Sequence, residues 1–250
     1  MIAGPPRLPV TVPDVVRQLA GASAVNPVWC NQTGGTTFEI DGTAGRRFIK
    51  WSPTGSGIDL SAEVARLQWA VRYTPVPKVL DHGANSDGQW LLTAALPGTS
   101  AVAGRWLADP DTAVAGLGRG LRQLHDALPV AACPFDWSAE VRIEDAQLRL
   151  GDGTEALERV AAPPPVDRLV VCHGDACAPN TLLDGDGRPV GHVDLGALGT
   201  ADRWADLAVA TWSTEWNYGG DWTDTLLDAY GVQRDPSRID YYRLLRTLGP

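Results

Sequence analysis

The order of local patterns along the chain restricts the fold more than any other feature of the sequence. Short apolar and aromatic runs separated by turn residues fill residues 27–95, whereas segments with helical spacing dominate residues 111–248. Asp41-Gly42 marks a hairpin within the first part. Strand-rich and helix-rich parts that follow one another, rather than alternate, are typical of an α+β architecture. We therefore predict an α+β fold with two lobes.

The strand-rich part is expected to form a small lobe with an antiparallel sheet and one helix. Asp59 or Ser61 can cap this helix, in which apolar residues recur at helical spacing. The segment 96–99, Leu-Pro-Gly-Thr, interrupts the pattern and predicts a hinge, so that the lobes comprise residues 1–96 and 97–250. The expected strands span residues 28–30, 37–40, 47–51, 76–80 and 89–95.

The second part is expected to form a larger, mainly helical lobe. Two short strands are predicted at residues 167–172 and 190–195, and residues 129–165 show no clear pattern. The expected helices span residues 111–128, 204–216, 222–230 and 238–248.

Charge and composition restrict the partners and the location of the protein. The formal net charge is −9, and residues 173–250 hold 12 acidic residues against 6 arginines. This balance disfavours nucleic acid and anionic membranes and favours a cationic ligand, with plain solubility as the alternative. We find no long apolar run and no secretory signal, and we interpret the four cysteines as reduced thiols rather than a zinc site. A cytoplasmic protein, monomeric or weakly dimeric, is expected.

Three polar positions in the second part have the spacing that phosphoryl transfer requires. Asp175 follows an apolar strand within His173-Gly174-Asp175, Asn180 comes five residues later, and Asp194 ends the next predicted strand. In such a reaction one carboxylate orients the attacking hydroxyl and accepts its proton. An amide oxygen and a second carboxylate hold magnesium against the phosphates. These residues therefore predict one catalytic centre.

The first part offers groups that would hold a nucleotide. Lys50 lies on the third predicted strand, and Glu63 lies on the following helix, where it can pair with the lysine. Gly34 and Gly35 allow a loop backbone to approach phosphates closely. Each of these features is common alone, but their order along the chain favours a kinase.

Several segments resemble the aminoglycoside phosphotransferase family. Residues 171–180 are similar to its catalytic loop, and residues 192–208 are similar to its streptomycin 3″-phosphotransferase branch. The resemblance implies a two-lobed protein-kinase-like fold. It also implies transfer of phosphate from ATP, with GTP as the alternative, to a hydroxyl of a small cationic molecule such as streptomycin, with Mg²⁺. Weaker similarity to the same branch covers residues 91–98, 123–126, 133–135 and 241–244.

The resemblance also implies a role for each matching residue. Asp175 would be the catalytic base, and Asn180 and Asp194 the magnesium ligands. Lys50 would contact the α- and β-phosphates with Glu63 as its partner. His173 would be structural, steadying the loop by hydrogen bonds, and Asp206 would be structural by bonding to the backbone of the catalytic loop. The remaining nucleotide contacts would come from Gly34, Gly35 and Thr36 in the glycine loop and from Leu92, Thr93, Ala94 and Ala95 near the hinge.

The acceptor site is the part that the sequence defines least. Asp202, Glu215 and Trp204 are candidate substrate contacts, with Asp221 and Asp224 as further carboxylates. Asp202 has an alternative as a helix cap or as the partner of Arg203. The tryptophans of residues 204–222 have an alternative as core residues. The glycine loop and the region 139–165 are short for the family. A kinase for another metabolite and a nucleotide-binding protein without activity therefore remain as alternative functions.

Overall fold

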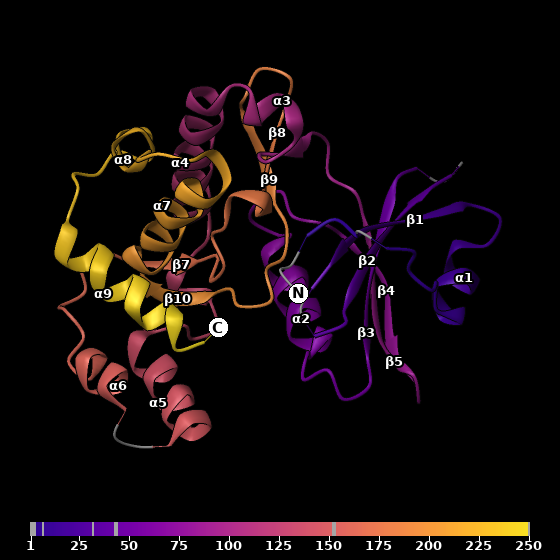
Figure 1. Ribbon diagram of the computed structural model, residues 1–250, viewed down its shortest axis with the longest axis horizontal. Helices are drawn as coiled ribbons and strands as arrows, with labels where there is room; N and C mark the ends of the chain where they lie inside the picture. Colours follow the sequence, from indigo (N-terminus) through magenta and orange to yellow (C-terminus); the bar gives the residue numbers. More distant parts are fainter. Residues whose placement is uncertain (1–3, 7, 32, 43–44, 152–153, 250) are drawn as a thin grey trace. The chain divides into compact units, whose positions relative to one another are not determined.

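The protein divides into two compact units, each of which has its own core. The structure is a computed structural model that describes residues 4–6, 8–31, 33–42, 45–151 and 154–249. The N-terminal unit consists of Met1–Val71 and Pro77–Leu96, and the C-terminal unit of Arg72–Val76 and Pro97–Pro250. Figure 1 shows the strands of the first unit and the helices of the second.

An antiparallel five-stranded sheet, in the order β1-β2-β3-β5-β4, forms the centre of the N-terminal unit. Alternation along β3 directs Ile49 to one face, where it is fully buried with Val16 of helix α1. Lys50 points to the other face, on which helix α2 lies (Figure 1). The elements are α1 (Asp14–Ala20), β1 (Ala24–Cys30), β2 (Thr36–Asp41), β3 (Arg47–Pro53), α2 (Leu60–Ala70), β4 (Val79–Ala84) and β5 (Gly88–Ala94).

Helix α4 is the central element of the C-terminal unit. Asp109 caps it by accepting a hydrogen bond from the backbone of Thr112, and its apolar face is buried against the helices and small sheets around it. A Cβ at Gly118 would lie 2.3 Å from the carbonyl oxygen of Leu226, so only glycine allows α4 to pack this closely on α8. The helices of the unit are α3 (Gly104–Leu107), α4 (Pro110–Ala127), α5 (Ala139–Leu150), α6 (Glu155–Val160), α7 (Trp204–Tyr218), α8 (Thr223–Tyr230) and α9 (Pro236–Thr247).

Two small sheets in the C-terminal unit hold the loops that carry the candidate catalytic residues. Strand β7 pairs with β10, and β8 lies between β6 and β9, all antiparallel. Two short 3₁₀ helices, η1 (Val130–Ala132) and η2 (Ala178–Asn180), complete the unit. The strands are β6 (Thr99–Ser100), β7 (Leu169–Cys172), β8 (Thr181–Leu183), β9 (Pro189–His192) and β10 (Gly199–Asp202).

The predicted α+β class is confirmed, and the differences from the expected elements have local causes. Strand β4 begins at Val79 instead of residue 76, because Pro75 and Pro77 have no backbone N–H to donate. Strand β9 ends at His192 instead of residue 195, since Asp194 has a left-handed backbone with φ of 64°. Among the described residues, no helix combines the length and the apolar character needed to cross a lipid bilayer.

Helices α5 and α6 fill the region in which the sequence shows no pattern. The buried positions of α5 are Ala139, Arg142 and Ala146. Two small residues and an arginine do not produce the apolar stripe by which an amphipathic helix is found. The packing of this helix therefore could not be read from hydrophobic spacing.

Candidate active site

Lys50 and Glu63 form the ion pair that the sequence predicts in the N-terminal unit. The Nζ atom of Lys50 lies 2.7 Å from both carboxylate oxygens of Glu63. Lys50 comes from β3 and Glu63 from the first turns of α2, where Asp59 caps the helix through the N–H of Ser61. Glu63 is buried, so its charge requires a partner, and the lysine side chain is thereby held in one orientation.

The loop between β1 and β2 is closed by a side chain that the sequence analysis missed. The Oδ1 atom of Asn31 accepts hydrogen bonds from the backbone N–H groups of Thr33 at 3.1 Å and Gly35 at 2.6 Å. Gly34 has a positive φ of 90°, which glycine adopts without strain. These N–H groups therefore bond to Asn31, rather than pointing outward as a preformed phosphate cradle. Gln32 of this loop lies outside the described residues.

The other expected nucleotide contacts of this unit are mostly occupied within the fold. Thr36 and Thr93 are buried strand residues, and Leu92 belongs to the core cluster of the sheet. The N–H groups of Ala94 and Ala95 donate to the carbonyl oxygens of Lys78 and Arg46. Leu92 consequently stabilises the core, and neither alanine has its N–H available for a base.

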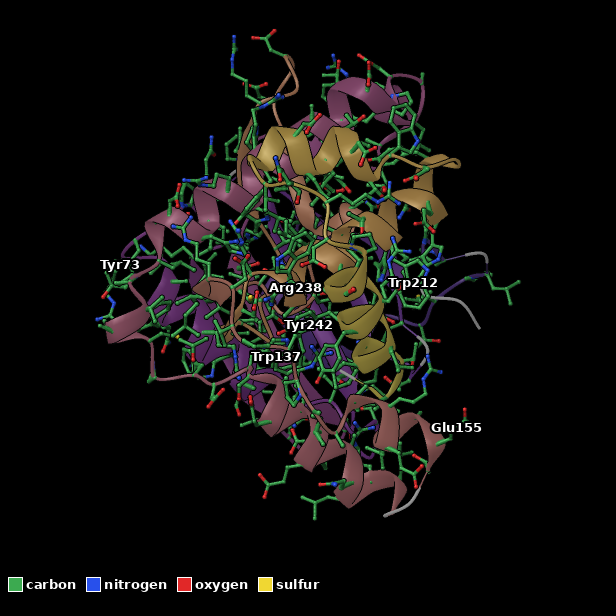
Figure 2. The ribbon with its side chains drawn as sticks, turned by 90° about the vertical axis from the view of Figure 1, so that its left-hand side faces the viewer. Tyr73, Trp137, Glu155, Trp212, Arg238 and Tyr242 are labelled. Carbon is green, nitrogen blue, oxygen red and sulfur yellow. The ribbon has the colours of Figure 1, made fainter. Side chains whose placement is uncertain are left out.

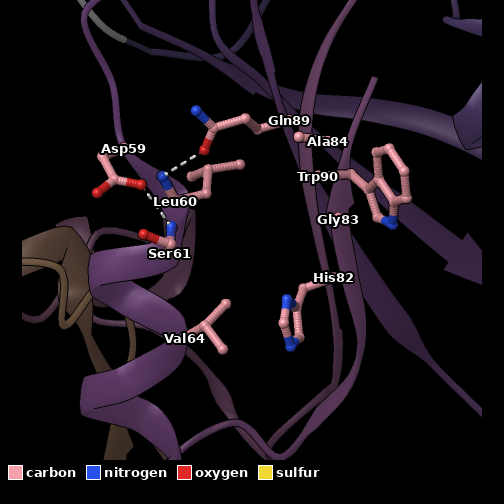
Figure 3. A pocket seen from close by; sticks show the side chains of 9 residues that line it. All are labelled: Asp59, Leu60, Ser61, Val64, His82, Gly83, Ala84, Gln89 and Trp90. Carbon is pink, nitrogen blue, oxygen red and sulfur yellow. Dashed lines mark hydrogen bonds between the residues drawn. The ribbon is translucent and has the colours of Figure 1, made fainter.

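A depression of the N-terminal unit lies apart from the ion pair of Lys50 and Glu63. It has a volume of about 350 Å³ and lies between the start of α2 and the strands β4 and β5 (Figure 3). Gln89 accepts a hydrogen bond from the N–H of Leu60 at its edge. Lys50 and Glu63 do not line this depression.

In the C-terminal unit, one buried carboxylate holds the loop after β7. Asp206 of α7 accepts hydrogen bonds from the backbone N–H groups of His173 at 2.6 Å and Gly174 at 3.0 Å. Its Oδ2 also lies 2.9 Å from Nε2 of His125. Burial opposes the charge of Asp206, but the hydrogen bond and charge of His125 hold the pKa of Asp206 below its usual range. The predicted contact between Asp206 and the loop backbone is present.

Gly174 is required at its position by close contact. It has a φ of 84°, and a Cβ there would lie 2.1 Å from the carbonyl oxygen of Ala197. The loop therefore packs directly against the segment that follows Asp194. This contact fixes the backbone position from which the side chain of Asp175 extends.

Asp175 and Asn180 contact each other. The Nδ2 atom of Asn180 donates to the carbonyl oxygen of Asp175 at 2.9 Å and to its Oδ2 at 3.2 Å. Because both bonds use the amide nitrogen, the amide oxygen of Asn180 is the atom left for a cation. Asp175 is partly accessible, with 31% of its side chain exposed, as a group that meets a substrate must be.

Asp194 is tied to the same loop through its neighbour. The N–H of Val193 donates to the carbonyl oxygen of Asn180 at 2.9 Å, and Nε2 of His173 lies 3.0 Å from the carbonyl oxygen of Val193. Asp194 is exposed and, among the described residues other than glycine, alone has a positive φ. Such backbone strain is frequent at functional sites. The oxygens of Asn180 and Asp194 are ligands of the kind that Mg²⁺ prefers.

Asp202 and Trp204, two candidate substrate contacts, have partners within the fold, as the structural alternative expects. Asp202 is buried, and its carboxylate accepts hydrogen bonds from the N–H groups of Asp167 and Trp204 and from Arg238. Asp202 therefore binds the first N–H of α7 from the position before its N-cap Arg203, and its ionic partner is Arg238 rather than the adjacent Arg203. The side chain of Trp204 is buried and donates to Asp167.

The other candidate acceptor contacts are at the surface in ion pairs. Glu215 lies 2.6 Å from Nη2 of Arg243, while Asp221 and Asp224 share Arg234 at 3.3 and 3.4 Å. Trp212, labelled in Figure 2, packs against Trp216 with ring centroids 4.6 Å apart.

Arg246 is a site residue that no pattern in the sequence predicts. This residue lies at the end of α9, and its Nη2 donates to Oδ1 of Asp175 at 2.9 Å. The two residues are 71 positions apart, and no local pattern marks their contact. The only hint in the sequence is that the last helix holds three arginines.

Two features of the chain are those expected of a kinase-like phosphotransferase. The N-terminal unit has a lysine–glutamate pair between its sheet and its helix, and the C-terminal unit has an Asp–Asn loop followed by a further Asp. Residues 32–242 match the family described as "Phosphotransferase enzyme family". The chain belongs to this family, and it is a phosphotransferase with the kinase-like fold.

Named relatives agree with this assignment. The chain is 35% identical over 220 residues to an aminoglycoside 3′-phosphotransferase of Streptomyces fradiae, covering 78% of this chain and 81% of the relative. It is 32% identical over 246 residues to a streptomycin 3″-kinase of Streptomyces griseus, covering 86% and 88%. The structure of aminoglycoside phosphotransferase APH(3″)-Id from Streptomyces rimosus, in complex with ADP and streptomycin, superimposes with a TM-score of 0.71 at 28% identity, covering 93% and 95%.

Proposed function

We propose that the protein transfers the γ-phosphoryl group of ATP to a hydroxyl of a small molecule in the cytoplasm, with Mg²⁺ as the metal and GTP as the alternative donor. The observation that carries the proposal is the loop in which Asn180 bonds to Asp175 through its amide nitrogen. In this arrangement the amide oxygen of Asn180 remains for a cation, and the carboxylate of Asp175 remains partly exposed to an acceptor. The ADP in the complex of the Streptomyces rimosus relative supports a nucleotide donor.

Each residue has a role that follows from its chemistry. Asp175 orients the acceptor hydroxyl and takes its proton as the new O–P bond forms, while the bond from the γ-phosphorus to the bridging oxygen breaks and ADP leaves. Asn180 and Asp194 would hold Mg²⁺, whose charge would offset that of the phosphates. Lys50, oriented by Glu63, contacts the α- and β-phosphates.

Aminoglycosides such as streptomycin are the acceptors that the names of the relatives support. The acidic balance of residues 173–250 agrees with a cationic acceptor. To test the proposal, the protein is incubated with Mg·ATP or Mg·GTP and a panel of aminoglycosides, and the products are analysed by mass spectrometry. A product that has gained one phosphoryl group, absent with the Asp175→Asn variant, is expected. The absence of transfer to any small molecule, with nucleotide still bound, would contradict the proposal and favour an inactive nucleotide-binding protein.

A kinase for another small metabolite is the second candidate, and the charges of the C-terminal unit favour it. The carboxylates expected to bind a polycation are engaged: Asp202 with Arg238, Glu215 with Arg243, and Asp221 and Asp224 with the same Arg234. Each ion pair lowers the negative charge that a polycationic acceptor would meet. Phosphorylation of a metabolite in preference to every aminoglycoside would identify this second function.

A further inference from the structure

The carboxylate of Asp175 receives hydrogen bonds from three side chains of the C-terminal unit. Oδ1 accepts from Nη2 of Arg246 at 2.9 Å and from the thiol of Cys177 at 3.3 Å. Oδ2 accepts from the amide nitrogen of Asn180 at 3.2 Å. Burial and the charge of Asp175 raise the pKa of the Cys177 thiol, so this group keeps its proton and can donate it to the hydrogen bond.

One acceptor position of this carboxylate remains for a substrate. An ionised carboxylate has about four such positions, two on each oxygen. Arg246 and Cys177 use both positions of Oδ1. Asn180 uses one position of Oδ2, and Oδ2 has no other donor among the described residues. The second position of Oδ2 is therefore the one open to the hydroxyl of an acceptor.

The bond from Arg246 is the strongest of the three, because it joins two charged groups. It holds the side chain of Asp175 from α9, whereas Asp206 of α7 holds the backbone of the same loop. The side chains of Arg246 and Asp175 are 26% and 31% exposed, and a partly exposed ion pair contributes little to folding. The pair should therefore affect the orientation of Asp175 more than the stability of the protein.

We propose that Arg246 is a positioning residue, which turns the carboxylate of Asp175 so that Oδ2, rather than Oδ1, receives the acceptor hydroxyl. The inference rests on the proposed function. The proton of the hydroxyl moves to Oδ2 as the hydroxyl oxygen bonds to the γ-phosphorus. The bond from this phosphorus to the bridging oxygen breaks, and its electron pair leaves on ADP. Without Arg246 the carboxylate rotates about its χ2 torsion, which has no single preferred angle of its own.

The charge of Arg246 also predicts how a cationic acceptor responds to loss of this residue. The acceptor hydroxyl and Nη2 of Arg246 both lie within hydrogen-bond distance of one carboxylate in the proposed complex. Removing the guanidinium thus removes a repulsion from a cationic acceptor, while a misplaced base slows the chemical step. The constant kcat should fall, and KM for the acceptor should stay the same or fall as well.

The test measures kcat and KM with streptomycin, the hydrolysis of Mg·ATP by water, and the melting temperature of each variant. We expect Arg246→Ala to lower both rates by about 30- to 100-fold, and Arg246→Lys, which keeps a charged donor, to recover part of the loss. The matched control is Arg243→Ala, which removes another guanidinium of α9 from its carboxylate partner, Glu215. This control should change the rates by less than about threefold and should have a melting temperature near that of Arg246→Ala.

Added guanidinium chloride distinguishes positioning from a structural role. Because Asp175 and Arg246 are both partly exposed, a free guanidinium ion can enter the space that Arg246→Ala leaves. At concentrations far below those that unfold proteins, it should raise the rates of Arg246→Ala by about tenfold, and sodium chloride at equal ionic strength should not. Crystal structures of wild type and Arg246→Ala should show the carboxylate of Asp175 rotated in the variant.

The inference is overturned if Arg246→Ala keeps rates within about threefold of wild type, or if guanidinium and sodium chloride have the same effect on this variant. An unchanged carboxylate of Asp175 in the structure of Arg246→Ala overturns it as well, and this criterion applies even without turnover. A failure of the proposed function has a different signature, since wild type itself would then transfer phosphate neither to streptomycin nor to water.

Discussion

Replacing Asp206 with asparagine tests whether one buried carboxylate holds the catalytic loop. The carboxylate accepts hydrogen bonds from the backbone N–H groups of His173 and Gly174 and contacts Nε2 of His125. Asparagine has the same shape but only one oxygen, so its NH₂ group must face one of these N–H groups. That backbone donor and the new NH₂ group would both lie buried without partners.

The expected loss of stability follows from this geometry. A buried polar group without a partner costs about 1–3 kcal/mol, and two such groups predict that Asp206→Asn lowers the free energy of unfolding by about 3–5 kcal/mol. Urea unfolding at neutral pH measures this quantity. The matched control is Asp126→Asn, because the exposed Asp126 pairs with Arg122 and Arg168 at the surface and should cost less than about 1 kcal/mol.

The pH dependence of the free energy of unfolding gives an independent measurement of the contacts of Asp206. The pKa of Asp206 in the folded protein is lower than its ordinary value of 3.8. The stabilisation is therefore complete above that value and is lost as the pH falls through the folded-state pKa. The difference between wild type and Asp206→Asn should shrink in acid. A variant as stable as the Asp126→Asn control at neutral pH would refute the assigned role of Asp206.

Three further predictions concern activity. Asp175→Asn should lower kcat by about 10³-fold while the affinity for Mg·ATP is retained, because proton acceptance is lost; near wild-type kcat would remove Asp175 from this role. Glu63→Gln should lower kcat/KM for ATP by about ten- to a hundredfold, since the charged partner that orients Lys50 is gone; steady-state kinetics with Glu39→Gln, from a more exposed pair, as control would detect an unchanged value. Asn31→Ala should release the N–H groups of Thr33 and Gly35 and raise KM for ATP without a comparable change in kcat, and equal effects on both constants would exclude this loop from nucleotide binding.

Local patterns predicted many of the elements, though not α5 or α6, and several contacts between neighbouring elements. The alternation of β3 and the cap of α2 were sufficient to place Lys50 and Glu63 on facing surfaces, and their contact is present. Asp175 and Asn180 lie five residues apart on one loop, so their contact also follows from a short segment. In these cases the information needed for the pairing is contained in the spacing of the residues.

Contacts between distant segments could not be predicted in the same way. The sequence offered the adjacent Arg203 as one alternative partner of Asp202, but the structure pairs Asp202 with Arg238 of α9, 36 positions away. Arg246 likewise reaches Asp175 only because α9 packs on α7. A charged residue has many partners of suitable sign along a chain, and the packing of helices decides among them.

The left-handed backbone of Asp194 has a consequence for how the protein can evolve. A Cβ in this conformation costs about 1 kcal/mol, which glycine would avoid. Substitution by glycine should therefore raise the melting temperature while removing the carboxylate that we propose as a magnesium ligand. Under the proposed function, selection for thermal tolerance alone would favour an inactive sequence, so the persistence of aspartate at this position would record selection for catalysis.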